Sequence, residues 1–309
     1  MIITVTLSAA MDKTVWIDSL KRGGLNRIRR IEYDGSGKGI NVSRSLYAMG
    51  VQSLATGLLG GTNGDAILRD VQAEGIEHDF VRTKSNTRTN TKVREEDGTL
   101  TEINEPGAFV TEEELHELMF RLKQYASPDT LFILSGSVPQ GAGPDIYAKL
   151  IRILHERGAS VLLDASGESF RLGVAEKPEI IKPNQVEIEE YAGLPEGSGS
   201  KKIIEASRGI VNSGIGTVAV TRGGKGAMLF TPECGLRCAA LPVVVGSTVG
   251  AGDAFTAGLA YAWKYHLSPE ETMELCMAAS AATVTTQGTK PAPMELINEL
   301  RKDVHLINI

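Results

Sequence analysis

Hydrophobic positions along the chain form short β-branched runs that alternate with longer segments of helical pattern. The runs predict strands at Ile2–Leu7, Ser53–Leu59, Thr130–Ser135, Ser160–Asp164, Ile180–Lys182, Thr217–Thr221 and Ala227–Phe230. The helical pattern predicts helices near Gly39–Met49, Asp65–Glu74, Thr111–Gln124, Pro144–Arg157, Gln185–Tyr191, Ser200–Ser213, Ala251–His266, Ser268–Thr286 and Met294–Lys302. This alternation is typical of an α/β fold in which helices cover both faces of a mostly parallel sheet.

Two regions depart from the alternation, because strand-like segments follow each other there without a helix between them. They are Thr14–Asp18 with Arg27–Asp34, and Thr87–Glu95 with Thr99–Asn104; the second pair encloses Glu96-Asp97-Gly98, a hairpin signal. We expect a small separate sheet that acts as a lid or pairs with another subunit. The predicted organisation is one α/β domain over residues 1–309, with lid strands at about 13–18, 27–34, 87–95 and 99–104.

Composition narrows the class of protein. The net charge of −6 argues against nucleic-acid or anionic-membrane partners. No apolar run reaches the roughly 18 residues that span a bilayer, and the beginning of the chain lacks a basic leader. Three cysteines give no disulfide framework. We therefore expect a cytoplasmic protein.

The segment 247–255 contains glycines directly before an aspartate and a helical pattern after it. Glycine permits a sharp turn, and the first amides of a helix are unpaired and attract anions such as phosphate. Asp253 would repel a phosphate, so we infer that it faces a second substrate and takes a hydroxyl proton while the amides hold the phosphoryl group. This combination predicts a kinase of a small alcohol. The alternative is that Asp253 only favours the start of a helix.

Two further segments are suited to a phosphorylated substrate. In the glycine-rich segment 35–44, Asn41 would hold sugar hydroxyls and Lys38 would meet a phosphate; the alternative is a tight turn with a solvated lysine. On a strand over 87–93, Arg88, Asn90 and Lys92 share one face that suits a phosphate group. The alternative there is a solvated strand whose charges prevent edge pairing.

Other polar clusters follow predicted strands. Asn184 and Glu187 have capping-box spacing, and the pair also suits Mg²⁺ and nucleotide phosphates. Thr221 opens a glycine-rich turn that is either a plain hairpin or a nucleotide loop. Asp12 follows the first predicted strand, and the segment 135–139 follows a central one. Because open α/β sheets bind ligands beyond the carboxyl ends of their strands, these loops together indicate a phosphotransferase.

Taken together, the motifs resemble the ribokinase-like sugar kinases, and within them the phosphofructokinase-B group. The resemblance is carried by Gly37-Lys38-Gly39-Ile40-Asn41-Val42, Ser135-Gly136-Ser137-Val138-Pro139, Lys182-Pro183-Asn184-x-x-Glu187 and Thr248-Val249-Gly250-Ala251-Gly252-Asp253. On the phosphate side, Arg88 and its neighbours look most like 1-phosphofructokinases and tagatose-6-phosphate kinases. The resemblance implies a three-layer sandwich with a four-stranded β lid, ATP and Mg²⁺ as cofactors, and a homodimer formed through the lid sheet.

The resemblance also implies a role for each matching residue. Asp253 would be the catalytic base, and Gly250, Ala251 and Gly252 would form the anion hole. The sugar phosphate would be bound by Asp12, Gly37, Lys38, Asn41, Arg88, Asn90 and Ser137. The nucleotide would be bound by Lys182, Asn184, Glu187, Thr221, Gly223, Gly226, Val249, Ala279 and Thr283, with Glu187 holding Mg²⁺ through water.

The chain departs from the family pattern at Ser8-Ala9-Ala10 and at Ser36, both on the sugar side. Three alternatives remain. A kinase of an unphosphorylated sugar or nucleoside would not need the paired cations Arg88 and Lys38. A dinucleotide-dependent dehydrogenase would need a glycine fingerprint after the first strand, which is missing. A catalytically silent sugar-phosphate sensor would not need Asp253.

Overall fold

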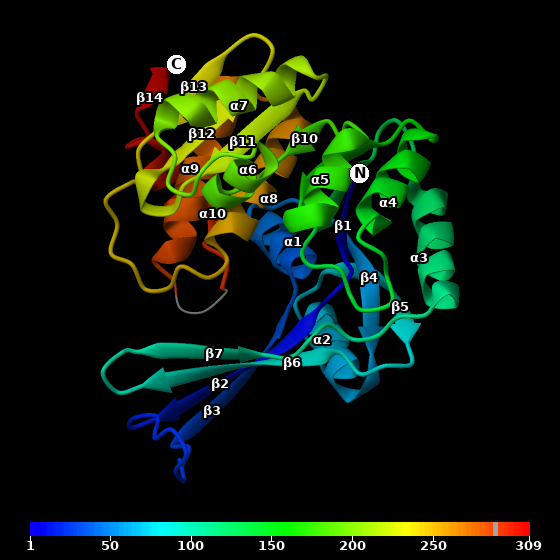
Figure 1. The fold of residues 1–309 in the computed structure, drawn as a ribbon, viewed down its shortest axis with the longest axis vertical. Helices are drawn as coiled ribbons and strands as arrows, with labels where there is room; N and C mark the ends of the chain where they lie inside the picture. Colours follow the sequence, from blue (N-terminus) through cyan, green and yellow to red (C-terminus); the bar gives the residue numbers. More distant parts are fainter. Residues whose placement is uncertain (287–289) are drawn as a thin grey trace.

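The body of the molecule is built on one large, mostly parallel sheet (Figure 1). The computed structural model describes residues 1–286 and 290–309. The strands are β1 Ile2–Thr6, β4 Leu54–Gly60, β5 Glu77–Thr83, β8 Leu131–Ser135, β9 Ser160–Asp164, β10 Ile180–Ile181, β11 Thr217–Thr221, β12 Ala227–Phe230, β13 Gly235–Cys238 and β14 Leu306–Asn308. Their order is β14-β13-β12-β11-β10-β9-β8-β1-β4-β5. Neighbours from β5 to β11 run parallel, whereas β12, β13 and β14 join antiparallel. The loops that follow the parallel strands therefore lie at one edge of the sheet.

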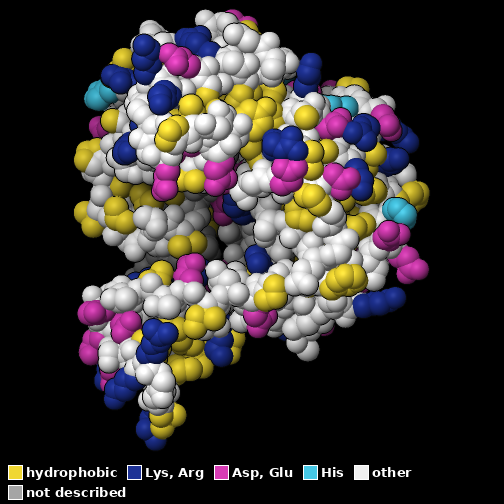
Figure 2. All heavy atoms as spheres, in the orientation of Figure 1, with side chains coloured by type: hydrophobic (Ala, Val, Ile, Leu, Met, Phe, Trp, Pro, Cys, Tyr) yellow, Lys and Arg dark blue, Asp and Glu magenta, His cyan; other side chains and the backbone are white. Residues whose placement is uncertain are grey.

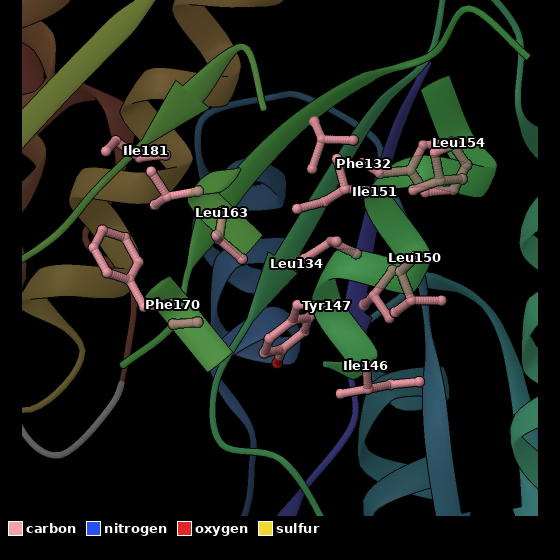
Figure 3. Close-up of a cluster of buried hydrophobic side chains, with 14 of the residues drawn as sticks. Phe132, Leu134, Ile146, Tyr147, Leu150, Ile151, Leu154, Leu163, Phe170 and Ile181 are labelled. Atoms are coloured by element: carbon pink, nitrogen blue, oxygen red, sulfur yellow. The ribbon is translucent and has the colours of Figure 1, made fainter. Parts of the chain in front are cut away.

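Helices cover both faces of this sheet and make three layers. They are α1 Lys38–Ala48, α2 Gly61–Ala73, α3 Glu112–Tyr125, α4 Ile146–His155, α5 Gly167–Ala175, α6 Gln185–Tyr191, α7 Ser200–Asn212, α8 Ala251–Tyr265, α9 Pro269–Val284 and α10 Met294–Arg301, with a 3₁₀ turn η1 at Gly223–Lys225. Helices α3 to α7 pack on one face, where the core in Figure 3 lies, and α1, α2, α8, α9 and α10 pack on the other. Successive strand residues point to opposite cores, as Ile2 and Ile3 do.

A second, four-stranded sheet projects from the body (Figure 1). Its strands are β2 Ala10–Ile17, β3 Arg30–Ser36, β6 Arg88–Glu95 and β7 Leu100–Asn104, in the order β3-β2-β6-β7. We call it the lid sheet. The predicted hairpin between β6 and β7 is present, with Gly98 at φ 91°. Figure 2 shows the surface hollowed between the lid sheet and the body.

The structure differs from the sequence prediction in several elements. Strands β5, β13 and β14 and helix α5 were not predicted. Edge strand β5 contains mostly polar residues, so it lacks the β-branched pattern that revealed the central strands. Strand β2 begins at Ala10 rather than Thr14, because from Ala10 onward it pairs with both β3 and β6. Within the described ranges, no helix is long and apolar enough to cross a membrane.

Candidate active site

The N-terminus of helix α8 is arranged to hold an anion. Gly250 precedes the helix with φ 85°, a left-handed conformation that favours glycine. The amides of Ala251, Gly252 and Asp253 have no hydrogen-bond partner among residues 1–286 and 290–309, and no side chain caps them. Three unpaired N–H groups at the positive end of the helix dipole are suited to hold an anion, and we call them the anion hole.

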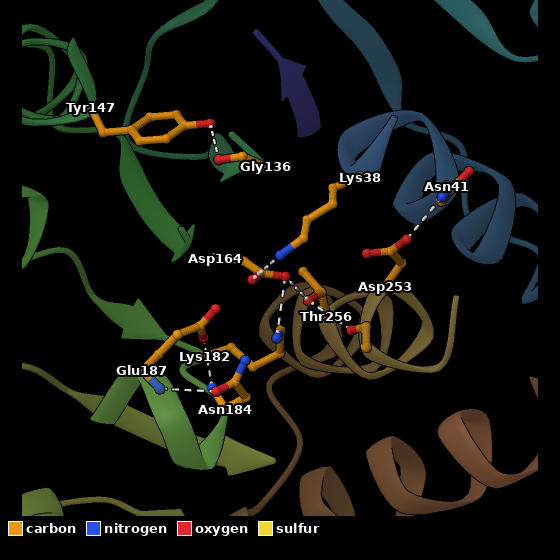
Figure 4. Close-up of polar contacts among 11 residues, drawn as sticks. Lys38, Asn41, Gly136, Tyr147, Asp164, Lys182, Asn184, Glu187, Asp253 and Thr256 are labelled. Atoms are coloured by element: carbon orange, nitrogen blue, oxygen red, sulfur yellow. Dashed lines mark hydrogen bonds and ion pairs between the residues drawn. The ribbon is translucent and has the colours of Figure 1, made fainter. Parts of the chain in front are cut away.

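Asp253 lies in the first turn of this helix and is buried, with 8% of its surface exposed. Its Oδ2 accepts a hydrogen bond of 2.9 Å from Nδ2 of Asn41 on α1 (Figure 4). Burial, and then the charge of Asp164, raise the pKa of Asp253 from 3.8 to about 6, while Asn41 and two lysines oppose the shift. A carboxylate with this pKa is a better proton acceptor at neutral pH than an ordinary aspartate.

A buried aspartate at the end of β9 organises the centre of the site (Figure 4). Asp164 Oδ1 lies 3.0 Å from Lys38 Nζ, and its Oδ2 lies 3.2 Å from Lys182 Nζ. Thr256 Oγ1 on α8 donates to the same carboxylate over 3.1 Å. Burial alone would raise the pKa of Asp164, but the two ammonium groups hold it below its usual range.

Asp164 has no role among the residues predicted from the sequence, although a carboxylate at the carboxyl end of a buried apolar strand is a signal that could have pointed to it. The ammonium of Lys182 lies 4.0 Å from where a Cβ on Gly252 would stand, so this lysine borders the anion hole. Lys38, predicted to meet the sugar phosphate, is paired here with Asp164. The two lysines therefore supply positive charge around Asp164, and Lys182 supplies it beside the N-terminus of α8.

Helix α1 brings Lys38 and Asn41 to this point by packing tightly on β1. Its first residues follow Gly37, and the Ile40 amide donates to Thr6 Oγ1 over 3.1 Å. A Cβ on Gly39 would stand 2.5 Å from that same oxygen, so only glycine fits. The glycines of this segment thus set how close α1 lies to the sheet.

Asp12 lies within β2, and not in a loop after the first strand as the sequence predicted. Its register partners are Asp34 on β3 and Asn90 on β6. Asp12 Oδ1 accepts from Asn90 Nδ2 over 3.1 Å, and Oδ2 pairs with Lys92 Nζ at 2.8 Å. The lid sheet therefore places Asp12, Asn90 and Lys92 on one face, and Lys92 is already neutralised by Asp12.

Arg88 begins β6 and reaches from the lid sheet toward the body. Its guanidinium donates to Ser137 Oγ over 3.4 Å and to the carbonyl of Glu105 over 3.3 Å, and no carboxylate pairs with it in the described part of the chain. Arg88 Nε and Asn90 Oδ1 are buried without a partner. Because buried polar atoms are nearly always satisfied, these two atoms are open to hydrogen bonds with a ligand or an ordered water.

The loop after β8 connects the two sides of the site. Ser135 Oγ is buried and unpartnered, and Gly136 lies beside the Lys38 stem, 3.7 Å from Lys38 Cβ to a Cβ placed on the glycine. Tyr147 on α4 donates to the Gly136 carbonyl over 2.9 Å and fixes the loop (Figure 4). Lys38 and Arg88 thus reach neighbouring residues of this loop from different elements.

A cavity of about 600 Å³ opens beside the anion hole. Thr221, Gly223 and Gly226 line it, together with Ala251 and Gly252 of the anion hole. Val249, Ala279 and Thr283 are not among its described lining residues; the last two are buried, and their neighbours Ser280 and Val284 face the cavity instead. One residue along a helix changes the direction of a side chain by about 100°, which the sequence motif did not resolve.

Asn184 and Glu187 lie at the start of α6. They form a complete capping box, in which Asn184 Oδ1 accepts from the Glu187 amide and Glu187 Oε2 accepts from the Asn184 amide. Burial raises the pKa of Glu187 above its usual value, and Lys182 counteracts that rise. The capping role does not occupy Glu187 Oε1, which has no hydrogen bond among the described residues.

Unpaired helix amides, a buried carboxyl in the same helix turn and a projecting lid sheet suit a phosphotransferase with a small-molecule acceptor. Residues 5–295 match the model of the pfkB family carbohydrate kinases. The 1-phosphofructokinase of Vibrio cholerae is 30% identical over 305 residues, which cover 99% of this chain and 96% of that protein. The chain belongs to the pfkB family of carbohydrate kinases, which confirms the resemblance found in the sequence.

Solved structures confirm the fold. The crystal structure of phosphofructokinase-2 from Escherichia coli in complex with potassium superposes with a TM-score of 0.93 and 28% identity, covering 98% of each chain. The Arabidopsis thaliana ribokinase complexed with ribose and ATP superposes with a TM-score of 0.78 and 23% identity, covering 97% of this chain and 98% of that one. The ribokinase-like α/β fold is therefore established, and with the family comes ATP as the phosphoryl donor.

Proposed function

We propose that this protein is an ATP-dependent kinase of a ketose phosphate, of the 1-phosphofructokinase or tagatose-6-phosphate kinase type, and that it produces a bisphosphate. The observation that carries the proposal is the Arg88 guanidinium, which faces neutral partners beside buried, unsatisfied polar atoms. A free sugar gives such a cation nothing to neutralise, whereas a sugar phosphate offers bidentate oxygens. A cytoplasmic location stays a prediction of the sequence.

The chain's own groups account for the phosphoryl transfer. Asp253 accepts the proton of the acceptor hydroxyl as the oxygen–phosphorus bond forms and the bond to the departing ADP breaks. The amides of Ala251 and Gly252 stabilise the charge on the transferred group, and Lys182 beside them adds a positive charge. Asp12 and Asn41 are suited to bind sugar hydroxyls, and the cavity bordered by Thr221 is suited to the nucleotide.

We propose that Glu187 holds Mg²⁺ through water. Mg²⁺ retains several waters and is typically bound by one or two carboxylates together with substrate phosphates. Glu187 offers one carboxylate oxygen that the capping box leaves open, close enough to Lys182 and Asp164 for their charges to act on it. When bound, the ion would neutralise charge on the phosphates of ATP.

The experiment that tests the function measures ADP release with Mg²⁺ and ATP against fructose 1-phosphate, fructose 6-phosphate, tagatose 6-phosphate, fructose and ribose. We expect turnover on a phosphorylated ketose. Activity confined to the free sugars would refute the assignment of Arg88. ATP binding without turnover on any of these five sugars would refute kinase activity on these ketose phosphates and point to a sugar outside the panel or to the sensor.

We also propose that the protein dimerises through the lid sheet. The strand register places Ile31, Tyr33 and Ile103 on the face opposite Asp12, and these side chains are 44%, 60% and 59% exposed. Large exposed apolar side chains on one sheet face favour association. In light scattering after size exclusion, Ile103→Asp should shift the dimer toward monomer, whereas Phe120→Asp, which alters an equally exposed residue on α3, should not. A monomeric wild-type chain would refute this proposal.

A further inference from the structure

The side chain of Arg44 connects helix α1 with the end of helix α2 and with strand β3, next to Asn41. It lies on α1 with 11% of its side chain exposed. Its Nε pairs with Glu74 Oε2, just beyond α2, at 2.7 Å, and its Nη1 donates to the Gly35 carbonyl of β3 over 2.5 Å. The same Nη1 lies 3.4 Å from Asn41 Oδ1, one helical turn earlier. None of these contacts involves the face of the lid sheet that carries Asp12, Asn90 and Lys92.

The contact between Arg44 and Asn41 favours the same orientation of the Asn41 amide as the contact with Asp253 does. Asn41 is 6% exposed, so its amide depends on protein partners. With the amide oxygen toward the Arg44 guanidinium, the NH₂ group faces Asp253 and donates to it over 2.9 Å. A flipped amide would place its oxygen against the Asp253 carboxylate and its NH₂ against a cation, and both contacts would be repulsive.

We propose that Arg44 is a positioning residue for phosphoryl transfer, which holds Asn41 in the orientation that fixes the carboxylate of Asp253. The guanidinium is itself held by Glu74 and by the Gly35 carbonyl. These two contacts oppose the small movement of the Arg44 side chain that would release Asn41. The inference rests on the proposed function for the role of Asp253 as proton acceptor.

The contact with Gly35 also ties the arrangement to the lid sheet. Gly35 pairs with Met11 on β2, the neighbour of Asp12. A Cβ on Gly35 would stand 3.0 Å from Ile67 Cγ1 of α2, so the strand is closely packed where Arg44 holds it. The Arg44 guanidinium thus contacts both Asn41, which donates to Asp253, and strand β3, which pairs with the strand that carries Asp12.

Loss of this arrangement has a defined electrostatic consequence. The groups that face Asp253 are Asn41 and Lys38 from α1, Asp164 from β9 and Lys182 after β10. Burial and Asp164 favour the protonated carboxyl, whereas the Asn41 amide and the lysines favour the carboxylate. If Asn41 no longer donates, the pKa of Asp253 rises further.

The test compares Arg44→Met, Arg44→Lys and a matched control, Arg121→Met. Arg121 is also a partly buried arginine that bridges a carboxylate and a carbonyl, of Asp79 and Phe80, but it lies on α3 away from the site. The first readout is the pH titration of the Asp253 carboxyl by ¹³C NMR in aspartate-labelled protein, assigned with Asp253→Asn. The second is kcat and KM on the active sugar.

In Arg44→Met we expect the Asp253 titration to move to higher pH and kcat to fall about tenfold to a hundredfold, as misplacement of a reacting group does. The KM for ATP should change less than kcat. Arg44→Lys retains a charge but has one nitrogen where the guanidinium uses two, Nε and Nη1, for its three contacts. It should therefore show the same changes to a smaller extent, and it serves if the methionine variant does not fold.

A titration of Asp253 in both Arg44 variants that coincides with the wild type and with Arg121→Met would overturn the inference. A loss of thermal stability with an unchanged pH titration of Asp253 would likewise show that Arg44 has only a structural role. An inactive wild-type chain would refute the proposed kinase, while the NMR titration would still decide whether Arg44 orients Asp253.

Discussion

Replacing Asp253 by asparagine should slow catalysis and at the same time stabilise the fold at neutral pH. The carboxyl is 8% exposed, and burial followed by the charge of Asp164 raises its pKa from 3.8 to about 6. An ionised carboxylate at this position therefore costs free energy in the folded state that asparagine would not cost. The asparagine retains an amide oxygen that can still accept from Asn41.

The pKa shift sets the size of the effect. The difference between 3.8 and about 6 is about 2 pKa units, which at about 1.4 kcal/mol per unit corresponds to about 3 kcal/mol. Because the folded-state pKa of Asp253 lies above its unfolded-state value, the cost is fully present above pH 6 and disappears as the pH falls below 4. The variant should thus be more stable than the wild type by up to about 3 kcal/mol at pH 8, with the difference shrinking toward pH 4.

Urea unfolding at pH 8 and pH 4.5 measures this difference, and ADP release measures the activity. Asp303→Asn serves as the control, because it removes an equal charge from an exposed position. We expect kcat of Asp253→Asn to fall at least about a hundredfold, the low end for loss of a general base. A variant less stable than the wild type at pH 8 would refute the destabilising carboxylate, and near-full kcat would refute its role as base.

Three further predictions concern the substrate phosphate, the anion hole and the buried ion pairs. Arg88→Ala should raise KM for the sugar phosphate by roughly tenfold to a hundredfold, the loss of about 1.5–3 kcal/mol from one charged hydrogen bond, and steady-state kinetics measure it. Gly250→Ala should lower the free energy of unfolding by about 1–2 kcal/mol, because alanine is disfavoured at φ 85°, and should raise KM for ATP. Asp164→Asn should destabilise the fold by about 3–5 kcal/mol in urea unfolding, because it leaves two lysines without their buried partner. Since the pKa of Asp164 is lowered in the folded state, its stabilisation should be present at neutral pH and lost on acidification.

Each of these predictions has a matched control. Arg94→Ala changes an exposed arginine of the same strand β6 and should leave KM unchanged. Gly199→Ala changes the residue before α7, which has φ −66° and open space around it, and should cost little. Asp145→Asn breaks an exposed pair with Lys149, which contributes little. Equal effects in a variant and its control would contradict the corresponding prediction.

Structural features that depend on a few neighbouring residues could be predicted from the sequence. The glycine turn before Asp253, the capping box of Asn184 and Glu187, and the hairpin at Gly98 were all predicted and are all present. Their geometry depends on local backbone conformation and on hydrogen bonds that span three or four residues. The central strands could also be predicted, because a strand that is buried on both faces needs a continuous run of apolar residues.

Contacts between distant residues could not be predicted in the same way. Asn41 and Asp253 are 212 positions apart, and the sequence gives no measure of how near α1 and α8 pack. The length of β2, and with it the place of Asp12 within the lid sheet, follows from pairing with strands on both sides. The rotational position of α9 about its own axis decides that Ser280, and not its neighbour Ala279, faces the cavity.

The sequence by itself therefore determined the α/β class, the strands of the lid sheet, the glycine turn at the start of α8 and the position of Asp253 after that turn, since each depends on local periodicity or on adjacent residues. Only the tertiary structure decided that Asp164 pairs with both Lys38 and Lys182, that Lys92 is neutralised by Asp12, and that Arg88 contacts the uncharged groups of Glu105 and Ser137. The physical reason is that the pairing and the pKa of a charged group depend on its burial and on the charges within a few ångströms, which packing brings together from distant parts of the chain.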